Sequence, residues 1–203
     1  MRFVLSSAIC LLGVVLLSGD SKQENAVSAV VHIPTYTDDG RLRPQLDYRE
    51  WVYLTSGFDM SYTPLDASRA GHSTFDNVFV NPEAYRSFLR TGTWPDRTML
   101  VLELRGAESN ASINKAGHFQ SESLRGVEMH VKDAARGGWA FYGFDGATPA
   151  KMVSKEANCY SCHRDHGAVD TTFVQFYPTL IPLAKQNSTF SANYLKDQAT
   201  SAK

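Results

Sequence analysis

Cys159, Cys162 and His163 are the residues of this chain whose types and spacing point most clearly to chemistry. They form a Cys-x-x-Cys-His sequence, the pattern by which c-type haem is attached. Two thiols three positions apart can add across the two vinyl groups on one edge of a porphyrin. The histidine after the second thiol is then carried beneath the ring, where it can ligate the iron. The motif therefore predicts one covalently attached haem c, with His163 as the iron ligand.

Three other interpretations of the two cysteines stay open. A thioredoxin-type redox pair usually lies at an early strand-to-helix junction, often with an internal proline, and neither applies here. A zinc site could use both cysteines with His163 and His166, but adjacent ligands crowd a tetrahedron and no second cysteine pair exists. The third alternative is a plain structural disulfide. Covalent haem is the favoured interpretation.

The sixth iron position decides the kind of haem protein, because electron carriers fill it with Met or a second His and ligand binders leave it open. The candidate methionines are Met60, Met99, Met129 and Met152. None lies in a Pro/Gly-rich loop that would present its sulfur, and two of them lie in predicted strands. Each histidine other than His163 is expected to be structural or on the surface. We therefore expect five-coordinate iron with an open position.

Composition and the N-terminal segment limit the function further. The 203 residues carry 20 Lys plus Arg against 21 Asp plus Glu, without the basic patch of a nucleic-acid binder. The apolar run 4–17 follows Arg2 and is shorter than the roughly 20 residues that span a bilayer. We expect residues 1–26 to be a cleaved signal peptide, so that Cys10 is lost and the protein is periplasmic or secreted, without stable membrane insertion.

Hydrophobic periodicity predicts a single α+β domain, with a mainly antiparallel β-sheet, flanking helices and the haem-attachment segment near its C-terminal end. We expect an irregular leader at 27–47, the haem domain at 48–184 and a frayed polar tail at 185–203. Strands are predicted at 75–80, 98–105, 124–132 and 138–144, loops at 57–71 and 106–117, and short helices at 82–91 and after 155–158. Residues 48–54 are predicted to be a short helix or the start of a strand, with the helix favoured. Asn81 is the expected N-cap of the second helix. Within 98–105, Leu100, Leu102 and Leu104 should form one buried face.

Six separated blocks of the sequence resemble the haem domain of the cytochrome P460 family, in order over residues 48–183. The blocks are 48–52 (YREWV), 78–85 (VFVNPEAY), 92–98 (GTWPDRT), 131–133 (VKD), 138–142 (GWAFY), and 159–163 together with 173–178 (FVQFYP). The resemblance implies an antiparallel sheet with flanking helices, a homodimer, and five-coordinate c-haem with His163 as proximal ligand. The family includes enzymes that oxidise hydroxylamine or nitric oxide, and the related cytochromes c′-beta that bind nitric oxide and carbon monoxide.

The sequence departs from the pattern of the family's enzymes at one position. The enzymes carry a lysine bonded to the porphyrin edge, one residue before the Glu-Leu pair that matches Glu103 and Leu104. Here that position is Leu102, which has no amine, and neither Lys115 nor Lys132 aligns with it. The missing amine favours a protein like the cytochromes c′-beta and argues against hydroxylamine oxidation.

We expect Leu102, with Phe75 or Phe141, to form an apolar wall on the open side of the haem. Such a wall favours small, weakly polar diatomic ligands. The sequence thus predicts an exported mono-haem cytochrome that binds nitric oxide or carbon monoxide in nitrogen-oxide sensing, buffering or detoxification, with a small redox protein as a further partner class. The alternatives are a hydroxylamine- or nitric-oxide-oxidising or peroxidase-like enzyme and, third, an electron-transfer cytochrome.

Overall fold

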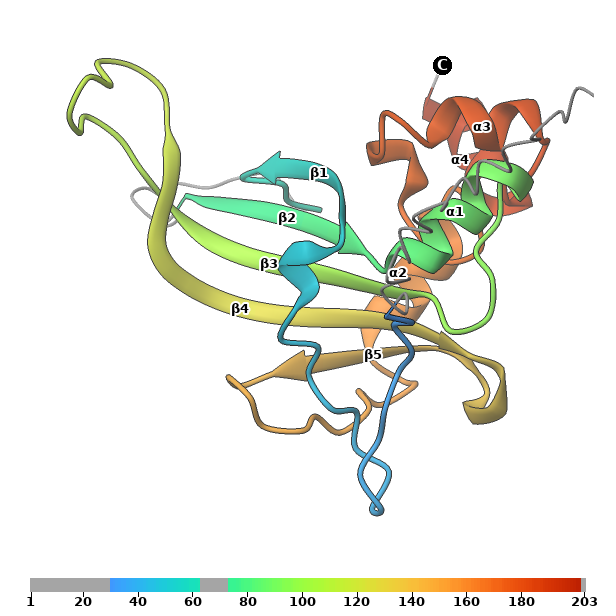
Figure 1. Ribbon diagram of the computed structural model, residues 1–203. Coiled ribbons are helices and arrows are strands. Elements are labelled where there is room, and N and C mark those ends of the chain that lie inside the picture. The colour runs from blue at the N-terminus through green and yellow to red at the C-terminus, as the bar shows by residue number, and fades with distance from the viewer. Residues whose placement is uncertain (1–29, 63–72, 202–203) are drawn as a thin grey trace, which may run out of the picture. The chain divides into compact units, whose positions relative to one another are not determined.

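The computed structural model describes residues 30–62 and 73–201, so the predicted signal peptide and most of the expected loop 57–71 lie outside the described residues. Five antiparallel strands form one sheet in the order β1-β2-β3-β4-β5 (Figure 1). Their bounds are β1 Val52–Phe58, β2 Thr74–Val80, β3 Met99–Glu108, β4 Phe119–Asp133 and β5 Gly138–Phe144. The predicted α+β fold with an antiparallel sheet is confirmed.

Four α-helices and three 3₁₀-helices accompany the strands in the described residues. They are η1 Tyr48–Glu50, α1 Pro82–Thr91, η3 Ala134–Arg136, α2 Asn158–His166, η4 Val174–Phe176, α3 Ile181–Gln186 and α4 Ala192–Ser201. Figure 1 shows α1, α3 and α4 gathered near the end of the sheet where β2 leads into α1. Of these helices, none is both long and apolar enough to cross a bilayer.

The strand register divides the sheet into two faces. On one face, which we call the helix face, Thr55, Val78, Leu102 and Glu128 stand side by side across four strands. Residues of this face pack with α1, α3 and α4 in the first hydrophobic cluster of the core. The core residues of that cluster are Leu54, Val80, Ala84, Phe88, Trp94, Leu100, Ala168, Val169, Val174, Tyr177, Leu180, Ala184 and Tyr194.

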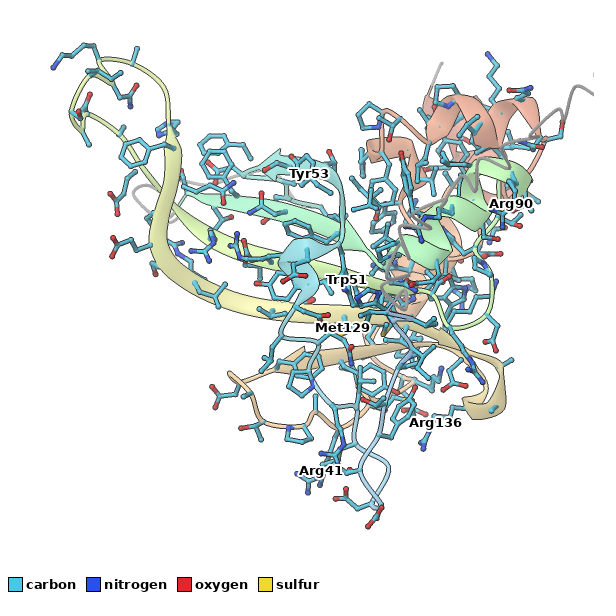
Figure 2. The ribbon with its side chains drawn as sticks, in the orientation of Figure 1. Arg41, Trp51, Tyr53, Arg90, Met129 and Arg136 are labelled. Atoms are coloured by element: carbon cyan, nitrogen blue, oxygen red, sulfur yellow. The ribbon has the colours of Figure 1, made fainter. Side chains whose placement is uncertain are left out.

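The opposite face, the leader face, is covered by the segment that precedes β1. Its central row is Tyr53, Phe79, Val101, Met129 and Tyr142. The second core cluster joins this face to Leu42, Tyr48, Trp51 and Ala150, and Figure 2 labels Trp51 and Met129 of that cluster. The leader is irregular, as predicted, and it is anchored because Leu42 is buried and bridges to Ala150.

Several local predictions need correction. Residues 48–54 are not one helix, because a single 3₁₀ turn gives way to β1 at Val52. The loop 106–117 is shorter than predicted, since β3 continues to Glu108 and β4 begins at Phe119. Asn81 stands at the N-cap of α1, but its side chain makes no capping bond. Its Oδ1 instead accepts from the Met99 backbone N–H at 2.8 Å and ties α1 to β3.

The prediction of a frayed tail is wrong. Residues 192–201 form α4, which packs against α2, and Tyr194 is buried in the first core cluster. Asn193 Nδ2 donates to the Arg164 carbonyl at 3.2 Å, and Ser191 Oγ donates to the Gly167 carbonyl at 2.7 Å. The polar composition of the tail therefore reflects the solvent side of a docked helix.

Candidate functional site

Helix α2 presents the three residues of the Cys-x-x-Cys-His sequence on one side. Cys159, Cys162 and His163 occupy positions i, i+3 and i+4, which share a face of an α-helix. Both thiols are free and half-buried. The helix ends where the Gly167 N–H donates to the His163 carbonyl at 2.9 Å. The prediction of a short helix that carries both cysteines is confirmed.

Tyr160, inside the motif, fastens α2 to β5. Its hydroxyl accepts a hydrogen bond from the Phe141 backbone N–H at 3.2 Å and donates one to the Val153 carbonyl at 3.2 Å. Its ring stands edge-on to that of Phe141, with 4.9 Å between centroids. The position of the helix relative to the sheet is therefore fixed by a residue between the two cysteines.

The imidazole of His163 has one nitrogen already engaged. Nδ1 lies 2.8 Å from the Thr171 carbonyl oxygen. Because a carbonyl can only accept, Nδ1 must carry the hydrogen, which leaves the Nε2 lone pair for a metal. Burial lowers the pKa of His163, and the bond to Thr171 partly offsets that effect, so the neutral ligand form is favoured at neutral pH.

The carbonyl that accepts from His163 belongs to a well-anchored turn, residues 167–173, which we call the acceptor loop. Thr172 Oγ1 accepts from Trp94 Nε1 and donates to the Val169 carbonyl, both at 2.8 Å. Lys132 Nζ binds the Asp170 carboxylate at 3.0 Å. These bonds tie the acceptor loop to the chain before β3 and to β4.

A cavity of about 730 Å³ opens between the helix face of the sheet and the segment after α2. His163 is part of its wall, and most of the other described lining residues have apolar or aromatic side chains. The wall comprises Thr55, Gly57, Met60, Ser61, Tyr62, Thr74, Asp76, Val78, Leu100, Val101, Leu102, Leu104, Glu128, Met129, His130, Phe141, His163, Thr172, Phe173, Phe176 and Tyr177.

The sequence profile of one family, Cytochrome P460, matches residues 45–174, which is more than half of the chain. This chain belongs to the cytochrome P460 family. Among curated proteins, none matches it significantly. Membership implies a haem cofactor, and the matched segment contains the whole sheet, α2 and the acceptor loop.

The residues around the cavity fit the haem of a cytochrome P460 protein. The volume lies within the roughly 300–1,000 Å³ typical of sites that enclose most of a ligand. His163 offers a free Nε2 at the cavity, and Cys159 and Cys162 share its helix face. These three residues could hold the cofactor, with the remaining wall packed against its ring.

Of the residues predicted to face this cofactor, Leu102 and Phe141 lie in the cavity wall and Phe75 does not. Phe75 has the opposite parity on β2 from the lining residue Asp76. It packs instead against Phe58 at 5.0 Å between ring centroids. Alternation along β2 gives two equivalent faces, and the sequence does not say which one meets the cavity. Leu102 is half-buried because it borders this cavity.

Several polar residues of the wall were not singled out from the sequence, among them Glu128, His130, Asp76 and Tyr62. Glu128 and His130 pair with Leu102 and Leu100 on the same face, and only the register of the folded sheet reveals this. The wall is therefore less purely apolar than the sequence suggested. Glu128 and Tyr62 are both exposed residues of this wall.

The alternative interpretations of the cysteines find little support in this geometry. The helix that carries both cysteines begins at Asn158, well after the last strand ends at Phe144, and therefore not at the early strand-to-helix junction of a thioredoxin-type pair. Within residues 30–62 and 73–201, no group of three or more His, Cys, Asp or Glu side chains is arranged to hold a metal ion. His166 points elsewhere, with Nδ1 at 3.1 Å from the Asp197 carboxylate of α4.

Proposed function

We propose that this protein is an exported mono-haem c-type cytochrome whose five-coordinate iron binds nitric oxide or carbon monoxide. Cys159 and Cys162 would hold one haem covalently, with His163 as the iron ligand. The cellular role would be sensing, buffering or detoxification of nitrogen oxides. When bound, the haem supplies an iron whose second axial position can take a diatomic molecule.

In this proposal the protein's own residues hold the haem, orient its iron ligand and keep water out of the cavity. Tyr160 holds α2 on β5, and the Thr171 carbonyl directs the neutral His163 ring by its hydrogen bond to Nδ1. Leu100, Leu102 and their neighbours on the helix face supply an apolar wall that favours weakly polar ligands over charged ones.

The observation that carries the choice of ligand is the position of Leu102. Its side chain borders the cavity, between Val78 and Glu128 in the strand register. Among the described residues that line the cavity there is no lysine. The amine that the oxidising enzymes of the family bond to their porphyrin is therefore missing at the matching position, which supports ligand binding over hydroxylamine oxidation.

An absorption spectrum of the reduced holoprotein, with and without carbon monoxide, tests the open iron position. We expect the Soret band to sharpen and move on addition of carbon monoxide, and we expect Met60→Leu to behave like the wild type. Met60 is the informative variant, because its thioether lines the cavity and packs so closely over Gly57 that a Cβ there would collide with its sulfur. A six-coordinate spectrum that responds to carbon monoxide only in Met60→Leu would instead support an electron-transfer cytochrome.

Covalent attachment is tested by Cys162→Ala, with Ser161→Ala as the matched control in the same helix. Loss of one thioether bond should lower the fraction of protein that keeps haem mass after denaturation, whereas Ser161→Ala should retain wild-type haem. Equal haem mass in both variants would contradict the attachment at Cys162.

A second candidate function is oxidation of hydroxylamine or nitric oxide. It is favoured by Glu128 and Asp76, because carboxylates in the cavity wall can take up protons from a bound substrate. Turnover of hydroxylamine with an artificial electron acceptor, abolished in Glu128→Gln, would establish this enzyme in place of the ligand binder.

We also propose export to the periplasm or beyond, a homodimer, and a small redox protein as partner. The apolar run 4–17 after Arg2 supports export, and the family resemblance supports the dimer. Mass spectrometry of the secreted protein gives the mature N-terminus, and light scattering on a sizing column gives the oligomeric state. A retained residue 1 or a monomeric mass would contradict these two points.

A further inference from the structure

His130 of β4 lies beside His163, although the two are far apart in the sequence. The ring centroids are 5.0 Å apart and the planes are nearly perpendicular, at 78°. The His130 ring is held in turn by Phe141, on which it stacks at 3.9 Å with an interplanar angle of 12°. His130 is buried and borders the cavity. The edge of His163 thus stands against a fixed pair of rings.

Thr171 of the acceptor loop connects the same two histidines by polar contacts. Its hydroxyl lies 3.4 Å from His130 Nε2, and its carbonyl accepts from His163 Nδ1 at 2.8 Å. A shift of Thr171 would therefore change the hydrogen bond that orients the His163 ring. Partners of this kind set the orientation of a metal-binding imidazole and the basicity of its free nitrogen.

We infer that His130 is a positioning residue for His163, acting through Thr171. The contact with His130 Nε2 holds the Thr171 side chain, so that the Thr171 carbonyl stays in line with His163 Nδ1–H. The ring stack with Phe141 keeps His130 itself in place. This inference rests on the proposed role of His163 as iron ligand and adds a residue from β4 to the support of that ligand.

The iron–histidine stretching band in the resonance Raman spectrum of the reduced holoprotein tests this role, since it reports the bond at His163 Nε2. His130→Phe keeps an aromatic ring on Phe141 but removes the nitrogen, and Thr171→Val removes the hydroxyl but keeps the carbonyl. We expect both variants to shift the band to lower frequency. The double variant should shift it no further, because both changes break one contact. His130→Gln, which keeps a polar group towards Thr171, should restore most of the wild-type frequency.

Thr189→Val is the matched control for a general loss of stability. Its hydroxyl donates to the Gly92 carbonyl at 2.7 Å, in a contact that involves neither His130 nor the acceptor loop. This variant should lower the unfolding temperature and leave the Raman band in place. If His130→Phe does not fold, Thr171→Val decides the question. If both His130→Phe and Thr171→Val carry covalent haem and their bands are unshifted, the role of His130 is overturned but the proposed function is not. A wild-type protein without haem would overturn the proposed function as well.

Discussion

Replacing Glu103 by Gln would remove the only carboxylate that the structure places fully inside the sheet among its described residues. Glu103 side-chain exposure is 0 %. Its oxygens accept from Tyr48 Oη at 2.5 Å, Arg105 Nε at 2.9 Å and Asn77 Nδ2 at 3.2 Å, and also from Arg49. Glutamine has almost the same volume, but it carries no charge and turns one acceptor atom into a donor. One of the surrounding donors would then face the NH₂ group of the glutamine. The guanidinium groups of Arg49 and Arg105 would lose the carboxylate that they bind.

The expected loss is several kcal/mol. Hydrogen bonds to a charged group contribute about 1.5–3 kcal/mol each, and removal of one partner of a buried ion pair costs about 3–5 kcal/mol. The Arg49 side chain is 52 % exposed and that of Arg105 is 20 % exposed, so water can solvate them in the variant. We therefore take the lower end, about 3 kcal/mol of unfolding free energy. In a domain of this size that corresponds to a fall of about 6–12 °C in Tm.

The loss should also depend on pH. Burial alone would raise the pKa of Glu103, but the hydrogen bonds from Tyr48, Arg105 and Asn77 outweigh it and lower the pKa below its ordinary value of 4.5. A carboxyl with a lowered folded-state pKa stabilises the protein above its unfolded-state pKa, and this stability is lost as the pH falls through the folded-state value. The difference between the wild type and Glu103→Gln should therefore be full at pH 7 and shrink below about pH 4.5.

Thermal unfolding followed by circular dichroism at pH 7 and through the acid range measures both effects. Glu122→Gln, at an exposed position of β4, is the matched control and should unfold within about 0.5 kcal/mol of the wild type. A Glu103→Gln variant as stable as this control at pH 7, or a difference that stays constant into the acid range, would refute the reasoning.

Two further changes test the site. Tyr160→Phe removes the hydroxyl that joins Phe141 N–H to the Val153 carbonyl. Chemical denaturation should therefore show a fall of about 1–2 kcal/mol in the free energy of unfolding. An unchanged denaturation midpoint would mean that these hydrogen bonds do not stabilise the fold. Leu102→Lys places an amine at the matched position in the cavity wall, so the absorption spectrum of the reduced holoprotein should differ from that of Leu102→Met. Identical spectra of the two variants would count against the placement of Leu102 beside the porphyrin.

Elements with local signals were predictable from the sequence. Asn81 before α1, Pro82 at its first position and Gly92 after it are start and stop residues, and α1 begins and ends where they indicate. The strand Gly138–Phe144 was predicted with its observed bounds. The Cys-x-x-Cys-His spacing identified the haem-binding class, which the family membership supports. In each case the decisive residues are neighbours in the chain, so their pattern is readable without a fold.

Features that depend on pairing between distant segments were not predictable. Alternation along 98–105 indicated one leucine face, yet Glu103 between those leucines is more deeply buried than Leu102. Its partners come from η1, from β2 and from further along β3, and only the folded register brings them together. The same holds for His130, whose relation to His163 exists only because β4 and the acceptor loop meet.

Strand β3 joins the two halves of this fold through successive residues. Leu102 and Leu104 border the cavity on the helix face, and Glu103 between them is held on the leader face by Tyr48 and Arg105. Since successive side chains of a strand point to opposite faces, a shift of one residue in register would put a carboxylate into the cavity and a leucine among guanidinium groups. The buried ion network therefore fixes the register of the cavity wall. The residue at position 102, and with it the chemistry of the cavity wall, can therefore differ while Glu103 keeps β3 in the same register.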